Sequence, residues 1–269
     1  MQRLIFVLTA LFFGAVTPAT ADPMAGLGKQ ERADTLRFAI NNSLFTLYHE
    51  VGHLLIDKMK LPLLGREEDA ADNIATWLLL QKGTPDANQA LEDAAEGWMM
   101  SGMLYGSEFD DDDFAAGYTP DRHRSLQIVC MMVGADGSAF RPVANSFSMQ
   151  PDKQRSCHFD YEVIDRSIGA LLKDPGSGTR VDVRYQDGGR RLRLAERVLR
   201  SSGIFDHVAE EVRQGYRLSG RVKFTAQRCG EPNAFYDPET TEVIFCYELV
   251  QDFLEMYVKE LPARHGRPH

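Results

Sequence analysis

The chain has no long apolar run after its first residues and no excess of basic residues, and both absences narrow its function. Beyond residue 21, no stretch approaches the roughly 20 consecutive apolar residues that a membrane-spanning helix needs. The 30 Lys and Arg are outnumbered by 39 Asp and Glu, which gives a formal net charge of −9. Because the phosphate backbone of nucleic acids attracts clustered cations, we expect no nucleic-acid partner. Because a long apolar run is missing, we expect no membrane span in the mature chain.

Cysteine is also scarce, and the four residues form no C-x-x-C motif of the kind that holds structural zinc. An even number of cysteines in an exported chain indicates disulfides, and four cysteines allow three connectivities. We favour Cys229–Cys246, which flank a hairpin-like segment, and Cys130–Cys157, which close a loop-rich insert.

The N-terminus supplies the reason to expect export. A basic start at Arg3 is followed by an apolar run over residues 4–16 and by Ala-Thr-Ala at 19–21. This order resembles a secretory signal peptide cut after Ala21, and the run is too short to cross a bilayer comfortably. We therefore expect residues 1–21 to be removed and the mature protein to be periplasmic or secreted.

The stretch that carries chemistry is FTLYHEVGHLLI, residues 45–56. On a helix, residues four apart share a face, so His49 and His53 can present ring nitrogens to one ion with Glu50 beside them. Zn²⁺ with three protein ligands keeps a position for water, and a neighbouring Glu can take a proton from that water. The alternative is a core helix with two ordinary histidines. It is less favoured, because apolar neighbours would bury the polar residues without partners.

A second predicted helix, about residues 66–80, offers the remaining ligand. Glu68 and Asp72 lie four apart and share a face, and Ala70 and Ala71 would let the helix pack closely against another. We expect Glu68 to be the third zinc ligand and Asp72 to orient a ligand histidine. The alternative is a solvated acidic first turn, which the helix dipole favours. On the same geometry, Glu67 and Asp69 should point elsewhere.

These motifs together resemble the gluzincins, in which H-E-x-x-H is completed by a Glu within E-x-x-A-D or E-x-x-A-N on the next helix. The mature chain most resembles an exported bacterial metallopeptidase family of unknown function. The segments that carry this resemblance are HEVGH at 49–53, GREEDAAD at 65–72, CGEPNAFY at 229–236 and CYE at 246–248. The resemblance implies a mechanism class and leaves the substrate unspecified.

The remaining pattern predicts an α+β, mostly helical zincin-like fold with a small C-terminal antiparallel hairpin or sheet. We expect a helical zinc-site region at 22–174 and an α+β region at 175–269 that packs on it, together forming one composite catalytic domain. The segment 29–59 is expected to form one long helix or two helices separated near residues 41–43. The other expected elements are helices at 85–104, 161–173 and 248–261, a loop-rich segment at 134–160, and a hairpin of 218–225 with 241–246.

Several residues outside the zinc motif are candidates with a structural alternative. The C-terminal hairpin could lie beside the cleft, with Asn233, Tyr236 and Tyr247 binding substrate, or it could be purely structural. Tyr236, Tyr247 or His123 could stabilise the oxyanion. The acidic run 108–113 could bind a second metal, although a solvated loop is favoured because the spacing of a Ca²⁺ loop is missing.

The sequence as a whole predicts a peptidase that uses one Zn²⁺ per chain to hydrolyse peptide or protein substrates outside the cytoplasm. His49, His53 and Glu68 would bind the ion, and Glu50 would activate water and later pass the proton to the leaving amine. The alternative function is a non-catalytic exported binding or chaperone-like protein that keeps a structural zinc site.

Overall fold

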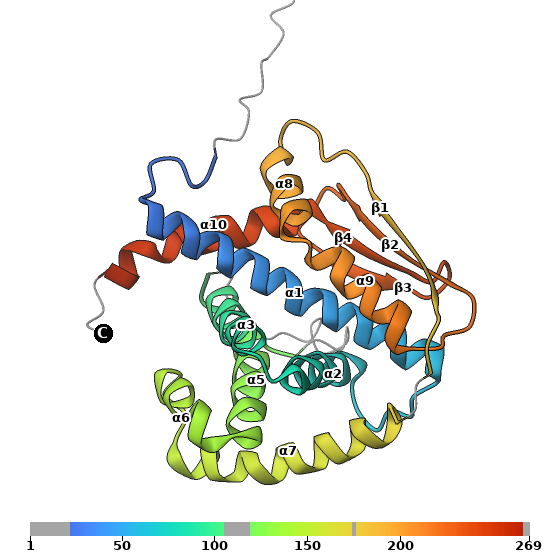
Figure 1. Ribbon diagram of the computed structural model, residues 1–269. Coiled ribbons are helices and arrows are strands. Elements are labelled where there is room, and N and C mark those ends of the chain that lie inside the picture. The colour runs from blue at the N-terminus through green and yellow to red at the C-terminus, as the bar shows by residue number, and fades with distance from the viewer. Residues whose placement is uncertain (1–21, 105–118, 174–175, 266–269) are drawn as a thin grey trace, which may run out of the picture.

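A single long helix forms the centre of the molecule. The computed structural model describes residues 22–104, 119–173 and 176–265, and in it α1 (Lys29–Met59) runs diagonally through the middle (Figure 1). One side of α1 carries helices α2 (Glu67–Lys82), α3 (Pro85–Leu104) and α5 (Asp121–Ala135). The other side carries a four-stranded sheet with α8 (Arg193–Ser202) and α9 (Ile204–Gly215). Helix α1 thus contacts elements of both predicted regions.

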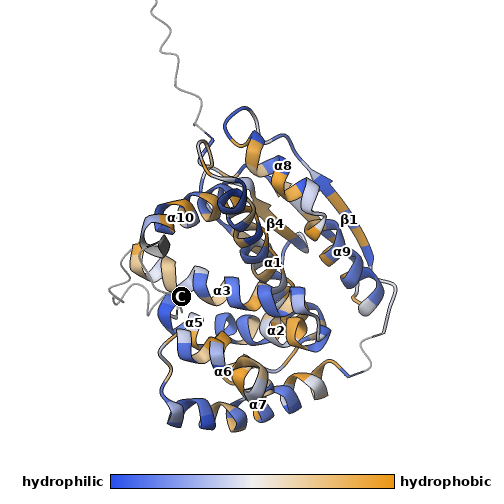
Figure 2. Cartoon of the chain, turned by 60° about the vertical axis from the view of Figure 1, so that its left-hand side comes forward, coloured by the Kyte–Doolittle hydropathy of each residue, from blue (hydrophilic) through white to orange (hydrophobic). Residues whose placement is uncertain are grey.

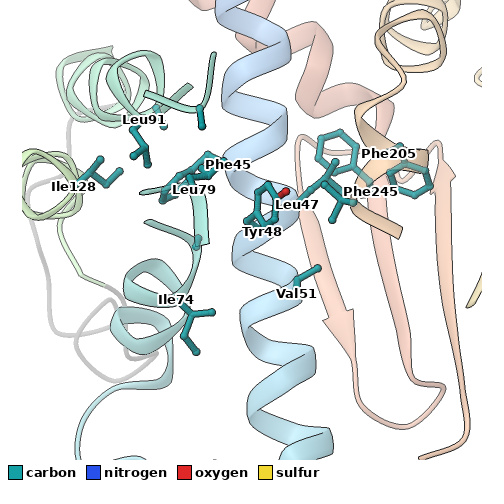
Figure 3. Packing of buried hydrophobic residues seen from close by; sticks show 14 of the residues in the cluster. Phe45, Leu47, Tyr48, Val51, Ile74, Leu79, Leu91, Ile128, Phe205 and Phe245 are labelled. Carbon is teal, nitrogen blue, oxygen red and sulfur yellow. The ribbon is translucent and has the colours of Figure 1, made fainter. Parts of the chain in front are cut away.

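Burial on two sides explains the sequence of α1. Phe45 points to the helical side with Leu79, while Leu47 points to the sheet side with Phe205 and Phe245 (Figure 3). A helix enclosed in this way shows apolar residues around most of its circumference rather than along one stripe. The helix begins after Gly28, whose N–H donates to the Glu31 carboxylate at 2.7 Å, and ends at Lys60, where φ is +53°.

The sheet is mixed, with strand order β1-β2-β4-β3. Strands β1 (Arg180–Tyr185), β2 (Arg221–Gln227) and β4 (Glu242–Cys246) are parallel, and β3 (Ala234–Asp237) is an edge strand antiparallel to β4. Hydrophobic and hydrophilic residues alternate along β1 (Figure 2), as expected of a strand with one face on the core. That core face packs on α9, where Phe205 meets Phe224 and Phe245.

The expected hairpin of 218–225 with 241–246 is wrong. Those segments are β2 and β4, which are parallel neighbours with Phe224 opposite Val243. The chain reverses through β3, a four-residue strand too short to be predicted from its alternation, and the antiparallel pair is β3–β4. Strand β1 was not predicted either. The α+β, mostly helical fold class is confirmed.

The expected loop-rich segment at 134–160 is also wrong, because it forms α6 (Gly137–Ser146) and about the first half of α7 (Pro151–Leu171). Asp136 caps α6 by accepting the N–H groups of Ser138 and Ala139, and Pro151 occupies the first turn of α7. The cysteine pairing is the expected one: Cys130 is joined to Cys157 and Cys229 to Cys246. Helix α10 (Tyr247–His265) follows β4 directly.

Two of the sequence-based expectations lie outside the described residues, namely the signal peptide at 1–21 and the acidic run at 108–113. Within the described part of the chain, no helix has both the length and the apolar character that crossing a membrane would require.

Candidate metal centre and substrate cleft

The two helices that carry the predicted ligands approach each other unusually closely. A Cβ on Gly52 of α1 would lie 2.9 Å from the Cα of Ala71 on α2 and 3.1 Å from its carbonyl oxygen. The absent side chain at Gly52 and the small one at Ala71 therefore allow backbone contact between the helices. This contact brings the first turns of α2 to the histidine face of α1.

Three side chains converge at this contact. Glu68 Oε2 lies 3.2 Å from His49 Nε2, Glu68 Oε1 lies 3.5 Å from His53 Nε2, and the two Nε2 atoms are 3.1 Å apart. All three residues offer one ligand atom within 4.8 Å of the others. Two imidazoles and one carboxylate are a donor set that Zn²⁺ accepts in catalytic sites.

The other ring nitrogens indicate why a cation fits here. His49 Nδ1 lies 2.8 Å from Asp72 Oδ1, and His53 Nδ1 lies 2.9 Å from Glu67 Oε1. A neutral imidazole that donates through Nδ1 carries its lone pair on Nε2. The two lone pairs then face each other and the Glu68 carboxylate, an arrangement that is repulsive unless a cation, either a metal ion or protons, lies between them.

Electrostatics in the metal-free protein agree with this geometry. Burial lowers the pKa of His49, but its hydrogen bonds to Asp72 and Glu68 outweigh burial and raise that pKa to about 9. His49 and His53 together hold the pKa of Glu68 well below its usual range. In the metal-free protein, the positive charge of protonated His49 thus offsets the nearby carboxylates, as a bound cation would.

Glu67 departs from the sequence-based expectation. It was expected to point away from the site, yet its carboxylate contacts His53 as Asp72 contacts His49. Glu67 is the first residue of α2, where a side chain can reach back along the neighbouring helix. Asp69 does point elsewhere and accepts a hydrogen bond from Thr119 Oγ1.

Arg124 is a site residue whose role sequence reasoning did not identify. Its Nε and Nη2 donate to the two oxygens of Asp72 at 2.6 and 2.7 Å, and its guanidinium stacks 3.6 Å from the Trp98 ring centroid. Burial raises the pKa of Asp72, but Arg124 and His49 outweigh burial and lower it to about 2. Asp72 is only 5% exposed, and its pairing with Arg124 and His49 keeps the buried carboxylate ionised.

Glu50 is the fourth member of the motif and has a different environment. It is 4% exposed and lines the cavity beside the histidines. Burial raises its pKa, the nearby histidines oppose that rise, and the backbone N–H of Tyr236 donates to the carboxylate. A carboxylate with a raised pKa is suited to accept a proton and later release it.

A cavity of about 1050 Å³ opens beside these residues. Its walls come from α1, α2, α3, α5, β3 and α10, and they include Trp98, Arg124, Asn233, Phe235 and Phe253. The cavity therefore joins the predicted metal centre to the C-terminal strand region, more than 160 residues along the chain.

The predicted substrate-binding residues separate into two groups. Asn233 and Tyr236 line the cavity, and the Tyr236 hydroxyl donates to Asp57 Oδ2 at 2.7 Å. Tyr247 does not line it: its ring is fully buried and its hydroxyl donates to the Gln186 carbonyl. His123 lines a separate cavity of about 350 Å³. Tyr247 and His123 are therefore not placed to assist an oxyanion at the metal centre.

Comparison with known proteins gives one match. A family model described as "Putative metallopeptidase" matches residues 19–172 and 186–265. Neither the curated proteins nor the solved structures contain a match to the chain.

Proposed function

Because the chain belongs to the metallopeptidase family whose model covers most of its length, we propose that it is a zinc-dependent peptidase. The observation that carries the proposal is the convergence of His49, His53 and Glu68 at one point, with buried Glu50 beside them in a cavity. In this proposal the three converging residues hold one Zn²⁺, while Asp72 and Glu67 fix the orientation of the two imidazoles.

Bound zinc would supply a water molecule of lowered pKa and polarise the substrate carbonyl. Glu50 would accept a proton from a water molecule held there and pass it to the leaving amine. Its buried position and raised pKa favour both transfers, because the protonated form is not strongly disfavoured. Arg124 keeps Asp72 ionised and in place, so that Asp72 continues to hold the Nδ1 proton of His49.

The edge strand β3 is the proposed site of substrate binding. It pairs with β4 on one side only, and the Tyr236 N–H on its other side points to Glu50. An extended peptide can add to such an edge through main-chain hydrogen bonds, and this would place its backbone next to the general base. Asn233 and Tyr236 would contact the peptide there.

A structural zinc site is the rival function, and it requires a fourth protein ligand. Asp69 is bonded to Thr119, and Asp72 lies on the Nδ1 side of His49, away from the convergence point. Neither side chain closes the site, which favours a catalytic role. We also propose that the protein is exported, on the basis of the signal-peptide pattern at 1–21 and the two disulfides.

The decisive experiment compares Glu50→Gln with the wild type in digestion of an unbiased peptide library. We expect the variant to bind zinc one to one and to lose hydrolysis by a factor of at least about 10². Glu92→Gln is the matched control, because burial also raises the pKa of Glu92 but this residue lies outside the cavity. Activity in Glu50→Gln equal to that of the control would remove the general-base role. A zinc-loaded wild type that cleaves no peptide would favour the structural-site rival.

A further inference from the structure

A second cavity, of about 350 Å³, is formed by α5, α6 and α7, which pack together (Figure 1). Its lining comes from the first turns of α5, the segment after α6 and the first turn of α7. Arg122 and Leu126 line it from successive turns on one face of α5. Asp121 and Arg124 of the same helix line the 1050 Å³ cavity instead, and the two cavities share no lining residue. We call the smaller space the α5–α7 cavity.

The more buried part of the α5–α7 cavity is apolar. Leu126 and Phe147 are partly buried and pack against the hydrophobic core, and Met149 is 8% exposed and belongs to that core. We call these three residues the apolar floor. The cavity volume lies within the range of small-molecule sites. A ligand that fills it therefore needs a small apolar body.

The rest of the lining carries positive charge, although the chain has a net charge of −9. Arg122, His123 and Lys153 line the cavity, and no acidic residue in the described part of the chain does. The Arg122 guanidinium forms no ion pair with any described residue. Lys153 donates to Asp160 at 2.8 Å, but both side chains are about half exposed, so the pair is weak and leaves ammonium N–H groups for a ligand. The α5–α7 cavity therefore favours an anion.

Ser148 occupies a backbone position that usually belongs to glycine. Its φ is +55°, and its N–H donates to the Asn145 carbonyl at 2.9 Å. The Met149 N–H donates to the Ala144 carbonyl at 3.0 Å, which completes a Schellman motif at the end of α6. Folding alone favours Gly at this position, whereas Ser148 places a side chain in the wall of the cavity. A hydroxyl that donates to a bound anion accounts for the serine.

We propose that the α5–α7 cavity binds a small carboxylate attached to an apolar group. The carboxylate pairs with Arg122 and Lys153 and accepts a hydrogen bond from Ser148, while the apolar group lies on the apolar floor. The N-terminus of α7, where Gln150 and Lys153 line the cavity, adds a partial positive charge. A fatty acid and the C-terminus of a peptide with an apolar last residue share this chemistry. The inference concerns a cavity separate from the metal centre and is independent of the proposed peptidase activity.

The test follows the methyl groups of isotope-labelled methionine by NMR while octanoate is added to the purified protein. We expect a saturable shift of the Met149 methyl and none of the Met256 methyl, which lines the larger cavity. Octanamide has the same chain without the charge and should bind about tenfold more weakly. Acetate lacks the apolar body and should not saturate the site. The blocked dipeptide N-acetyl-alanyl-leucine represents a peptide C-terminus, and the tighter of this probe and octanoate identifies the source of the carboxylate.

Two variants test the residues that hold the carboxylate. Arg122→Gln/Lys153→Gln should weaken octanoate binding about tenfold. Arg141→Gln/Arg166→Gln is the matched control, since it removes two exposed arginines of α6 and α7 outside the cavity and changes net charge equally. Ser148→Gly should raise the melting temperature and weaken octanoate binding about threefold, a pair of opposite effects that a purely structural residue would not give.

Three results would overturn the proposal. The first is a shift of the Met256 methyl with none at Met149, which would place octanoate in the larger cavity. The second is equal affinity for octanoate and octanamide, which would leave the positive lining without a role. The third is equal weakening by the two double variants, which would mean that net charge alone acts.

Discussion

At the scale of single residues, donors and charges alternate through the candidate site from buried Arg124 to the more exposed Glu68. Arg124 neutralises Asp72, Asp72 accepts the Nδ1 proton of His49, and His49 Nε2 faces Glu68. Each buried polar group thus has a partner, except for the place between the Nε2 atoms and Glu68 where a cation is required. This order explains why His49, although almost fully buried, has a raised pKa in the metal-free protein.

The raised pKa predicts proton release when zinc binds. With a pKa of about 9, His49 carries a proton at pH 7 in the metal-free protein, and it must lose that proton to become a ligand. Zinc affinity should therefore rise with pH up to about 9. Titration calorimetry at pH 7 in two buffers of different ionisation enthalpy should show release of about one proton. Equal heats in the two buffers would contradict the prediction.

The same shift has a consequence for stability without metal. Since the pKa of His49 in the folded protein lies above its ordinary value of 6.5, the protonated ring stabilises the metal-free fold fully below pH 6.5. That contribution is lost as pH rises through about 9. Melting temperatures measured in chelator should therefore fall over this range, and zinc should remove the dependence.

At the scale of secondary-structure elements, the contact of α1 with α2 at Gly52 positions the site. Gly52→Ala would place a Cβ against the Ala71 backbone, so the helices must separate. We expect a loss of stability of about 1–3 kcal/mol and weaker zinc binding, because Glu68 moves relative to the two histidines. Chemical denaturation and competition with a zinc chelator measure the two effects.

Gly169→Ala on α7 is the control for that substitution. A Cβ there meets nothing within 4 Å, so Ala should stabilise the helix by about 0.5–1 kcal/mol. Zinc affinity should not change in the control. If Gly52→Ala also left zinc affinity unchanged, the close contact would not be what places Glu68.

The elements also show where sequence reasoning succeeded. The long helix, its HEVGH face and the second helix with Glu68 followed from spacing, because a helix fixes which side chains share a face. The partners Arg124 and Glu67 did not follow in the same way. Arg124 reaches the site only through the packing of α5 against α3 and α2, which no local pattern encodes.

Strand pairing was the least predictable part of the fold. Strands β2 and β4 have clear strand sequences and a turn-like segment between them, and an antiparallel hairpin was therefore expected. The structure inserts β3 in that connection and makes β2 and β4 parallel. Parallel or antiparallel pairing depends on where α1 and the other elements lie, and local propensity does not determine it.

At the scale of the whole molecule, the Cys229–Cys246 disulfide encloses the segment that forms one wall of the cavity. Strand β3 lies inside this loop, whose cysteines are 17 residues apart. Cys229→Ser/Cys246→Ser should lower stability by about 3 kcal/mol, the loop-closure value for this length. It should also raise KM more than it lowers kcat, because β3 would bind peptide less firmly while Glu50 and the histidines stay in place.

The contrasting variant is Cys130→Ser/Cys157→Ser, which removes the bond between α5 and α7, away from β3. Its loss of stability should be similar, since its cysteines are 27 residues apart. Thermal unfolding and steady-state kinetics on the two variants separate the effects. An equal rise of KM in both would show that the β3 loop has no specific role.

The chain order of the cavity walls also has a consequence for synthesis. The helices with His49, His53 and Glu68 come first in the chain, whereas β3 and α10, which complete the cavity, come near its end. A chain that emerges from its N-terminus can therefore assemble the ligand set long before it has a surface to hold a peptide. In the proposed peptidase, this chain order would let the metal ligands come together before the wall that binds peptide is complete, so that metal binding would precede proteolysis.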